Sequence, residues 1–182
     1  MARLHYRKAR KDYPANGIKR GDMYYFAQIK TGPCSSRTIR SLTKPRPSEL
    51  TVSEFNGWLG DLQEIELPAV EDIEALRQIA ENIRDFGQEQ QDKFDNMPEG
   101  LQQGDTGQLL EERATGCDGW ADEIEQAADD YDSTIAEIEE MSADDLDLDE
   151  DATEDEIEVA RQEKRDEAFE EAKSAAESAC PF

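Results

Sequence analysis

Six oxygen-bearing side chains between residues 145 and 156 have the spacing of a calcium-binding loop. They occupy loop positions 1, 3, 5, 7, 9 and 12 and are Asp145, Asp147, Asp149, Asp151, Thr153 and Glu156. An EF-hand takes its ligands from these positions and needs glycine at position 6 for its sharp turn. Glu150 occupies that position here. We therefore predict no metal site, and we interpret the stretch as a solvated acidic connection with weak, non-specific affinity for divalent cations.

The remaining sequence contains no recognisable catalytic or ligand-binding motif. His5 is the single histidine and forms no recognisable Ser-His-Asp or Cys-His motif, and no glycine-rich phosphate loop is present. Cys34, Cys117 and Cys180 are far apart and odd in number, which excludes a zinc cluster and a disulfide framework and fits a reducing cytosol. We predict a non-enzymatic protein with no catalytic residue and no cofactor.

Charge is distributed very unevenly along the chain. The net charge is −25, yet residues 1–47 hold twelve Lys or Arg against two acidic residues. Between Arg113 and Arg161 there are twenty Asp or Glu and no Lys or Arg. Halves of opposite charge attract one another or attract different partners. No run approaches the roughly 20 apolar residues of a membrane span, so we expect no membrane association and a cytoplasmic location.

The basic residues of the first 47 are interleaved with aromatic residues. That combination suits phosphate neutralisation together with base stacking or groove contact. We predict that DNA or RNA is bound through Arg7, Lys8, Arg10, Lys11, Lys19, Arg20, Tyr24, Lys30, Arg37 and Arg40. Two alternatives stay open: the aromatics form the element's own small core, or the element folds onto the acidic half of the chain.

A second candidate site is a stripe of acidic residues in the following region. From residue 118 to residue 132 its members are four and three residues apart in alternation, which spaces negative charge by about 5 Å along one helix edge, and the last member follows seven residues later. We predict that it docks a basic protein surface through Asp118, Asp122, Glu125, Asp129, Asp132 and Glu139. The open alternative is a solvated coiled-coil face that binds nothing.

Residues 1–47 are expected to form a basic β-rich element that positions the cations. The segment 12–22, DYPANGIKRGD, carries the proline and glycine of turns. The aromatic and branched run 23–30, MYYFAQIK, predicts a strand. After the turn signal TGP, the run 35–41, SSRTIRS, predicts the return strand of a β-hairpin.

Residues 48–140 are expected to form a short helix and then a long antiparallel helical hairpin that resembles a coiled coil. Capping-box spacing at Thr51 and at Asp105, and Pro68 in a first turn, predict where its helices begin. An unbroken heptad pattern predicts the second long helix. Its apolar positions are Leu110, Ala114, Cys117, Ala121, Ile124, Ala128, Tyr131, Ile135 and Ile138.

Residues 141–152 are expected to form an acidic connection, and residues 153–182 a C-terminal helix. Thr153 and Glu156 have the spacing of a capping box at its start. The apolar stripe of this helix is mostly alanine, and such a thin face stabilises little by burial. Whether the helix packs on the hairpin or stands free is left open. The predicted fold class is α+β, mainly α.

Two patches of the sequence resemble a known family. KARKDYPANGIKRGDMYYFAQIKTG (8–32) and FDNMPEGLQQGDTGQLLEERATGC (94–117) are similar to an uncharacterised family carried by bacteriophages and prophages. The resemblance assigns no catalytic residues. It implies a phage accessory protein, a class in which strongly acidic members resemble DNA mimics, although the basic N-terminal element departs from that pattern. The first patch is also similar in style to the basic DNA-binding arms of phage integrases.

Together these features predict a two-part accessory factor that acts on nucleic-acid machinery. The basic element would contact nucleic acid or an acidic surface, and the acidic hairpin would dock a basic protein surface. One alternative is a DNA-mimic inhibitor of a host defence or nucleic-acid enzyme. Another is a structural virion component assembled into oligomers through the helical hairpin.

Overall fold

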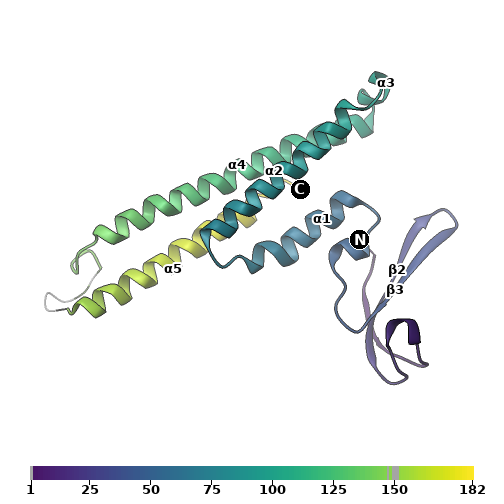
Figure 1. The fold of residues 1–182 in the computed structure, drawn as a ribbon, viewed down its shortest axis with the longest axis horizontal. Coiled ribbons are helices and arrows are strands. Elements are labelled where there is room, and N and C mark those ends of the chain that lie inside the picture. Colours follow the sequence, from purple (N-terminus) through teal and green to yellow (C-terminus); the bar gives the residue numbers. More distant parts are fainter. Residues whose placement is uncertain (1, 147, 149–151) are drawn as a thin grey trace. The chain divides into compact units, whose positions relative to one another are not determined.

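In a computed structural model, which describes residues 2–146, 148 and 152–182, the chain divides into two compact units, Met1–Pro68 and Ala69–Phe182. The first unit carries a three-stranded antiparallel sheet, and the second consists of long helices (Figure 1). The predicted fold class, α+β and mainly α, is confirmed.

The sheet of the first unit has the strand order β1-β2-β3. Strands β2 (Met23–Gly32) and β3 (Ser35–Ser41) form the predicted hairpin. Strand β1 (His5–Lys8), which sequence analysis missed, pairs with the first half of β2. All four of its side chains are exposed, so it lacks the apolar alternation by which a strand is recognised.

A small core lies between the sheet and the segment that joins β1 to β2. Ala9, Ile18 and Tyr24 are buried there, and Tyr13 and Phe26 pack against them. The segment contains the 3₁₀ turn η1 (Pro14–Asn16), followed by Gly17 at φ 67° and Gly21 at φ 100°. Both values lie in the left-handed region that glycine adopts without strain.

Residues 47–68 belong to the first unit, so the boundary lies at Pro68 and not after residue 47 as predicted. They form η2 (Pro47–Leu50), α1 (Glu54–Asp61), the π-helical turn η3 (Leu62–Glu66) and most of η4 (Leu67–Ala69). Hydrogen bonds explain the difference, because the Arg37 guanidinium donates to the Glu49 carbonyl at 2.8 Å and the Ala2 amide to the Leu50 carbonyl at 2.8 Å. Ser48 in turn binds Asp61 of α1.

The second unit is built on a hairpin of two long helices, α2 (Ile73–Asp95) and α4 (Asp105–Glu140), joined by the single turn α3 (Glu99–Gln102) (Figure 1). Ile138 is buried, as are five heptad positions nearer the middle of the helix, namely Ala114, Cys117, Ala121, Ile124 and Ala128. These five face the buried Leu76, Ala80 and Ile83 of α2, which has the most contacts with α4. The hairpin predicted from periodicity is therefore present.

Three predicted helix starts were wrong, and a fourth is confirmed. Ser53 caps α1, where Thr51 was expected, and α2 begins after Asp72, five residues beyond the proline of the predicted start. Helix α4 begins after Gly104 without a side-chain cap. At α5 (Glu154–Ser178) the predicted capping box is present, because the Thr153 hydroxyl accepts from the Glu156 amide and the Glu156 carboxylate accepts from the Thr153 amide.

Helix α5 packs along α4. The indole Nε1–H of Trp120 donates to the Ala176 carbonyl at 2.9 Å, and the rings of Tyr131 and Phe169 meet edge to face with centroids 6.2 Å apart. Trp120 is 1% exposed and Ala176 is fully buried. The alanine stripe was thus only part of the contact, since two aromatic side chains of α4 and one of α5 also contribute to it.

The acidic connection is ordered locally where it can be described. The amide and hydroxyl of Ser142 both donate to the Asp145 carboxylate, at 2.9 and 2.6 Å, and Leu146 is 8% exposed. Asp145 and Glu156, two of the six positions with calcium-loop spacing, are therefore engaged in local hydrogen bonds. The positions at Asp147, Asp149, Glu150 and Asp151 lie outside the described residues.

Candidate functional site

The strongest concentration of positive side chains lies on the sheet of the first unit. Strand register places Arg7 opposite Tyr24, and both His5 and Arg40 opposite Phe26, so these side chains share one face. The Arg7 guanidinium lies 3.5 Å from the centre of the Phe26 ring, and that of Arg40 lies 4.7 Å from the Tyr13 ring. Stacking of this kind holds the cations in place while leaving their charge available.

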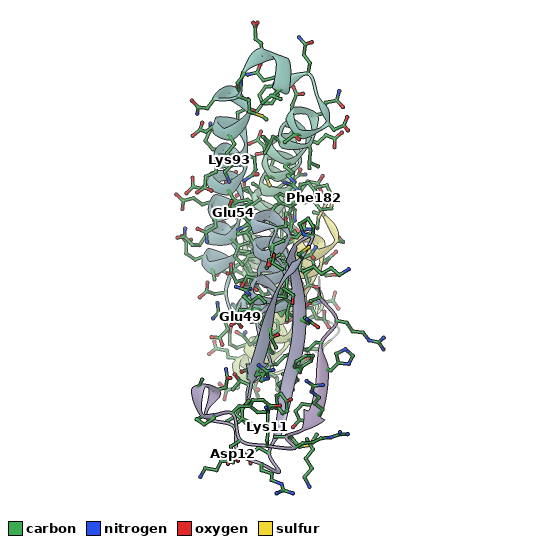
Figure 2. All side chains as sticks on the ribbon, turned by 90° about the vertical axis from the view of Figure 1, so that its right-hand side faces the viewer. Lys11, Asp12, Glu49, Glu54, Lys93 and Phe182 are labelled. Atoms are coloured by element: carbon green, nitrogen blue, oxygen red, sulfur yellow. The ribbon has the colours of Figure 1, made fainter. Side chains whose placement is uncertain are left out.

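Arg7 also lines an open hollow of about 1100 Å³. Three further basic side chains, those of Lys8, Arg10 and Arg20, surround it, and Tyr13 and Tyr24 line it as well. Asp12 and Asp22 fix the adjoining turn, because they accept hydrogen bonds from the Arg20 and Lys19 amides at 2.6 and 2.8 Å. In Figure 2, Lys11 and Asp12 mark this segment between β1 and β2. Such a hollow can bind a polyanion that presents several phosphates.

Tyr24 does not have the base-stacking role that was predicted for it. Its side chain is 2% exposed, and its hydroxyl accepts a hydrogen bond from Arg7 Nε at 3.0 Å. Burial raises the pKa of Tyr24, but hydrogen bonds with Tyr13 and Arg7 and the charges of Arg7 and Arg40 outweigh it, so the pKa lies below its ordinary value. Tyr24 is a core residue that positions Arg7, as the self-packing alternative expected.

Exposed aromatic surface lies on the other face of the sheet. Tyr6 is 59% exposed, and its ring centroid is 4.7 Å from that of Tyr25, its partner across the two strands. Tyr6 and Tyr25 are among the aromatic residues interleaved with the basic ones, but neither belongs to the predicted site. The alternation of side chains along β2 could have distinguished Tyr25 from Tyr24 and Phe26, because it places Tyr25 on one face of the sheet and the other two on the opposite face.

The remaining predicted cations are divided between the two faces. Lys30 follows Phe26 and Gln28 on the face that carries Arg7, and Lys11 lies 5.6 Å from the Tyr13 ring. Arg37 lies on the opposite face, where it binds the Glu49 carbonyl. Lys19 contributes its amide to the turn at Asp22. Strand register therefore places Arg7, Lys30 and Arg40 on one face of the sheet and Arg37 on the other. Arg10, Lys11, Lys19 and Arg20 belong to the segment between β1 and β2.

The predicted acidic stripe faces α2, and two arginines of that helix bind five of its six members. Arg84 contacts Asp118 at 3.7 Å, Asp122 at 2.7 Å and Glu125 at 2.5 Å. Arg77 contacts Asp129 at 3.1 Å and Asp132 at 2.5 Å. Glu139 lies near Arg165 of α5 and raises the pKa of that guanidinium after the larger effect of Glu158. Most of the stripe is thus paired within the chain, although the paired carboxylates remain 46–78% exposed. The pairing could not be predicted from α4 alone, because the arginines lie on α2.

Comparisons with protein-family models, with curated proteins and with solved structures found no match. Within the part of the chain that the structure describes, no helix is long and apolar enough to span a membrane. Among the same residues, no group of three or more His, Cys, Asp or Glu side chains is arranged to hold a metal ion.

Burial raises the pKa of the Cys117 thiol to about 11, aided by nearby Cys180 and opposed by Arg113, so this thiol is protonated at neutral pH.

The ion pair between Arg84 and Glu125 is expected to make stability depend on pH. The hydrogen bond from Arg84 lowers the pKa of Glu125, so the pair stabilises the fold above the unfolded-state pKa of about 4.3, and this contribution disappears as pH falls through the folded-state value. The Glu125 side chain is 46% exposed and screened by solvent. Glu125→Gln should therefore lower the free energy of unfolding by only about 0.2–1 kcal/mol at pH 7.

Urea unfolding between pH 7 and pH 3 checks this expectation. Glu123→Gln is the matched control, because Glu123 lies on the same helix and forms no ion pair with any described residue. The Glu125→Gln difference should shrink toward zero at the acid end. A difference that stays constant down to pH 3 would show that the ionised pair is not its source.

Proposed function

We propose that this protein is a non-enzymatic accessory factor with two interaction surfaces that acts on nucleic-acid machinery in the cytoplasm of a phage-infected cell. One observation carries the proposal: the two compact units of the fold have net charges of opposite sign. The unit Met1–Pro68 has twelve basic and seven acidic residues, a net charge of +5. The unit Ala69–Phe182 has eight basic and 38 acidic residues, a net charge of −30.

The basic hollow and its adjoining sheet face support nucleic-acid binding by the first unit. Arg7, Lys8, Arg10 and Arg20 can neutralise several phosphates at once, and Arg7 is held by both an aromatic ring and a hydrogen bond. Beyond the hollow the same face presents Gln28 and Thr38, a cross-strand pair of polar side chains suited to base edges. The major groove of DNA is wide enough to admit a two-stranded β-ribbon.

The charge of the helical unit supports its docking to a basic protein surface. Two arginines neutralise part of the predicted stripe, but most carboxylates of the unit remain exposed on the helices, as the oxygen-tipped side chains of Figure 2 illustrate. Like charges at this density repel one another and favour a partner of opposite sign. The partner of this unit would be a basic nucleic-acid-handling protein.

A DNA-mimic inhibitor is the second candidate, and the −30 charge of the helical unit favours it. The two functions separate in one respect. A mimic competes with DNA for an enzyme and binds no nucleic acid itself, whereas an accessory factor of the proposed kind binds nucleic acid through its basic unit.

Binding to nucleic acid is measured on the full chain by fluorescence anisotropy, with a labelled 20-base-pair duplex and a 20-nucleotide single strand over a series of salt concentrations. The triple variant Lys8→Ala, Arg10→Ala and Arg20→Ala should weaken binding and reduce the slope of log affinity against log salt by about 3, close to one per lost phosphate contact. The acidic unit also repels DNA, so binding is expected only at low ionic strength.

The matched control is the triple variant Arg3→Ala, Lys44→Ala and Arg46→Ala, which removes the same charge from the same unit outside the hollow. It should leave the salt slope nearly unchanged. If both triple variants lose affinity for nucleic acid to the same extent, the hollow is not the binding site. If the unaltered chain binds neither duplex nor single strand at low salt but displaces DNA from a basic enzyme, the accessory function is wrong and the mimic is favoured.

A further inference from the structure

A groove of about 590 Å³ runs between α4 and α5 on the surface of the helical unit. Its floor is made of small apolar side chains, among them Ala127, Ala168 and Ala175. Acidic side chains from both helices line it as well, namely Glu123, Asp130 and Glu171. The lining positions recur every three or four residues on each helix, so they form one continuous face.

We propose that this groove binds a lysine- and arginine-rich amphipathic helix of a partner protein. The inference rests on the proposed function of the acidic unit and deepens it by naming the docking site and the class of partner. The groove takes the place of the acidic stripe that sequence analysis favoured, because Arg77 and Arg84 bind five carboxylates of that stripe.

The shape of the groove fits a helix. Its α4 wall extends from Glu123 to Thr134, which corresponds to about 16 Å or three helical turns at 1.5 Å per residue. Alanine side chains allow a third helix to approach the seam to about 8 Å between axes, the lower end of the range for packed helices. The groove is held open by fixed contacts, since Trp120 and Tyr131 join α4 to α5 at the Ala176 carbonyl and at Phe169.

The charge of the groove selects a basic occupant. No lining residue is basic. Glu123, Asp130 and Glu171 form no ion pair with any residue that the structure describes, whereas the carboxylates on the α2 side of α4 do. The described arginines of α5 are directed elsewhere, since Arg165 binds Glu158 and Arg161 donates to the Met141 carbonyl. The helices of a second copy would bring the same excess of negative charge, so a basic partner is favoured over self-association.

The test uses the full chain and a fluorescein-labelled 21-residue peptide of alanine and lysine, with the lysines flanking an alanine face. Anisotropy at low salt should show saturable binding with one peptide per chain. Glu123→Gln, Asp130→Asn and Glu171→Gln together should weaken it about tenfold, the combined effect of three surface ion pairs. The variant Ala175→Trp, at an exposed position, should block the groove and reduce affinity to a similar extent.

The control triple is Asp85→Asn, Glu89→Gln and Glu163→Gln, which removes the same three charges from exposed positions outside the groove. It should change affinity by less than about twofold, because these carboxylates lie outside the groove and form no contact ion pair with a peptide bound in it. A peptide with the same composition and a scrambled order should bind weakly to every variant. Circular dichroism at 222 nm and the urea midpoint show whether each variant is folded.

If both triple variants lose affinity for the peptide to the same extent, the groove is not the binding site, although the acidic unit still docks a basic partner. A groove triple that binds the peptide as tightly as the unaltered chain would do the same. Stoichiometric self-association of the chain, relieved by Ala175→Trp, would replace the basic partner with a second copy. If the unaltered chain binds no basic peptide, both the inference and the acidic half of the proposed function fail, whereas the nucleic-acid measurement on the hollow stands by itself.

Discussion

Replacing Trp120 by alanine is expected to lower the free energy of unfolding of the helical unit by about 3–5 kcal/mol. The side chain is 1% exposed, and its indole N–H is the donor to the Ala176 carbonyl. Truncation removes the largest buried side chain of the unit and leaves a cavity between α4 and α5. Since the remaining face of α5 is mostly small, this helix should detach before the hairpin of α2 and α4 unfolds.

Urea unfolding followed by circular dichroism gives the free energy, and amide hydrogen exchange shows where protection is lost. Exchange should accelerate across Glu154–Ser178 far more than in the middle of α2. Trp120→Phe keeps an aromatic ring but removes the donor and part of the ring volume, so it should cost about 1–3 kcal/mol, partly through the unsatisfied carbonyl. A loss below about 1 kcal/mol for Trp120→Ala, or uniform acceleration of exchange, would show that α5 does not depend on this side chain.

Replacing Gly87 by leucine is expected to be strongly destabilising, by about 1–3 kcal/mol or more. A Cβ atom at this position would lie 2.8 Å from the Cys117 Cβ and 3.3 Å from the Ala114 carbonyl oxygen. Both obstacles are on α4 and are buried, so the two helices would have to move apart to accept the side chain. The overpacking outweighs the helix propensity that leucine gains over glycine, about 0.8–1 kcal/mol.

Gly119→Leu is the matched control, since an added Cβ at Gly119 meets nothing within 4 Å. The same substitution there should raise the free energy of unfolding by about 0.5–1 kcal/mol, through helix propensity alone. Thermal and urea unfolding of the two variants should therefore shift in opposite directions. Shifts of the same sign would mean that the approach of α2 to α4 at Gly87 is looser than the structure shows.

The elements predicted correctly from the sequence were those with a strong local signal. The heptads from Leu110 to Ile138 identify the long helix because burial on one face imposes the period of 3.5. The strands at 23–32 and 35–41 follow from composition and a turn. Thr153 and Glu156 form their capping box because both hydrogen bonds lie within one turn.

The features that escaped prediction depend on partners distant in the sequence. Arg77 and Arg84 are 34 to 55 residues from the carboxylates they bind, so the sequence of α4 alone gave no sign that the stripe is paired. Trp120 lies off the heptad seam, and its burial requires the second interface with α5. The sequence alone did not distinguish Tyr24 from Tyr6, since both are tyrosines among basic residues. Tyr24 is buried because the strand register turns it toward the segment 9–18, which covers that face of the sheet.

The close approach at Gly87 also determines which alignment of the two long helices is adopted. The acidic residues on α4 repeat every seven positions, so a slide of one heptad, about 10 Å, would bring Arg84 to Asp129 and Asp132 and Arg77 to Glu139. Ion pairs alone would tolerate that alternative. The same slide would carry Phe94, one heptad beyond Gly87, to Cys117, where the gap between the helices admits no side chain larger than hydrogen. The ion pairs hold α2 and α4 together, and the absence of a side chain at Gly87 determines the alignment of the two helices.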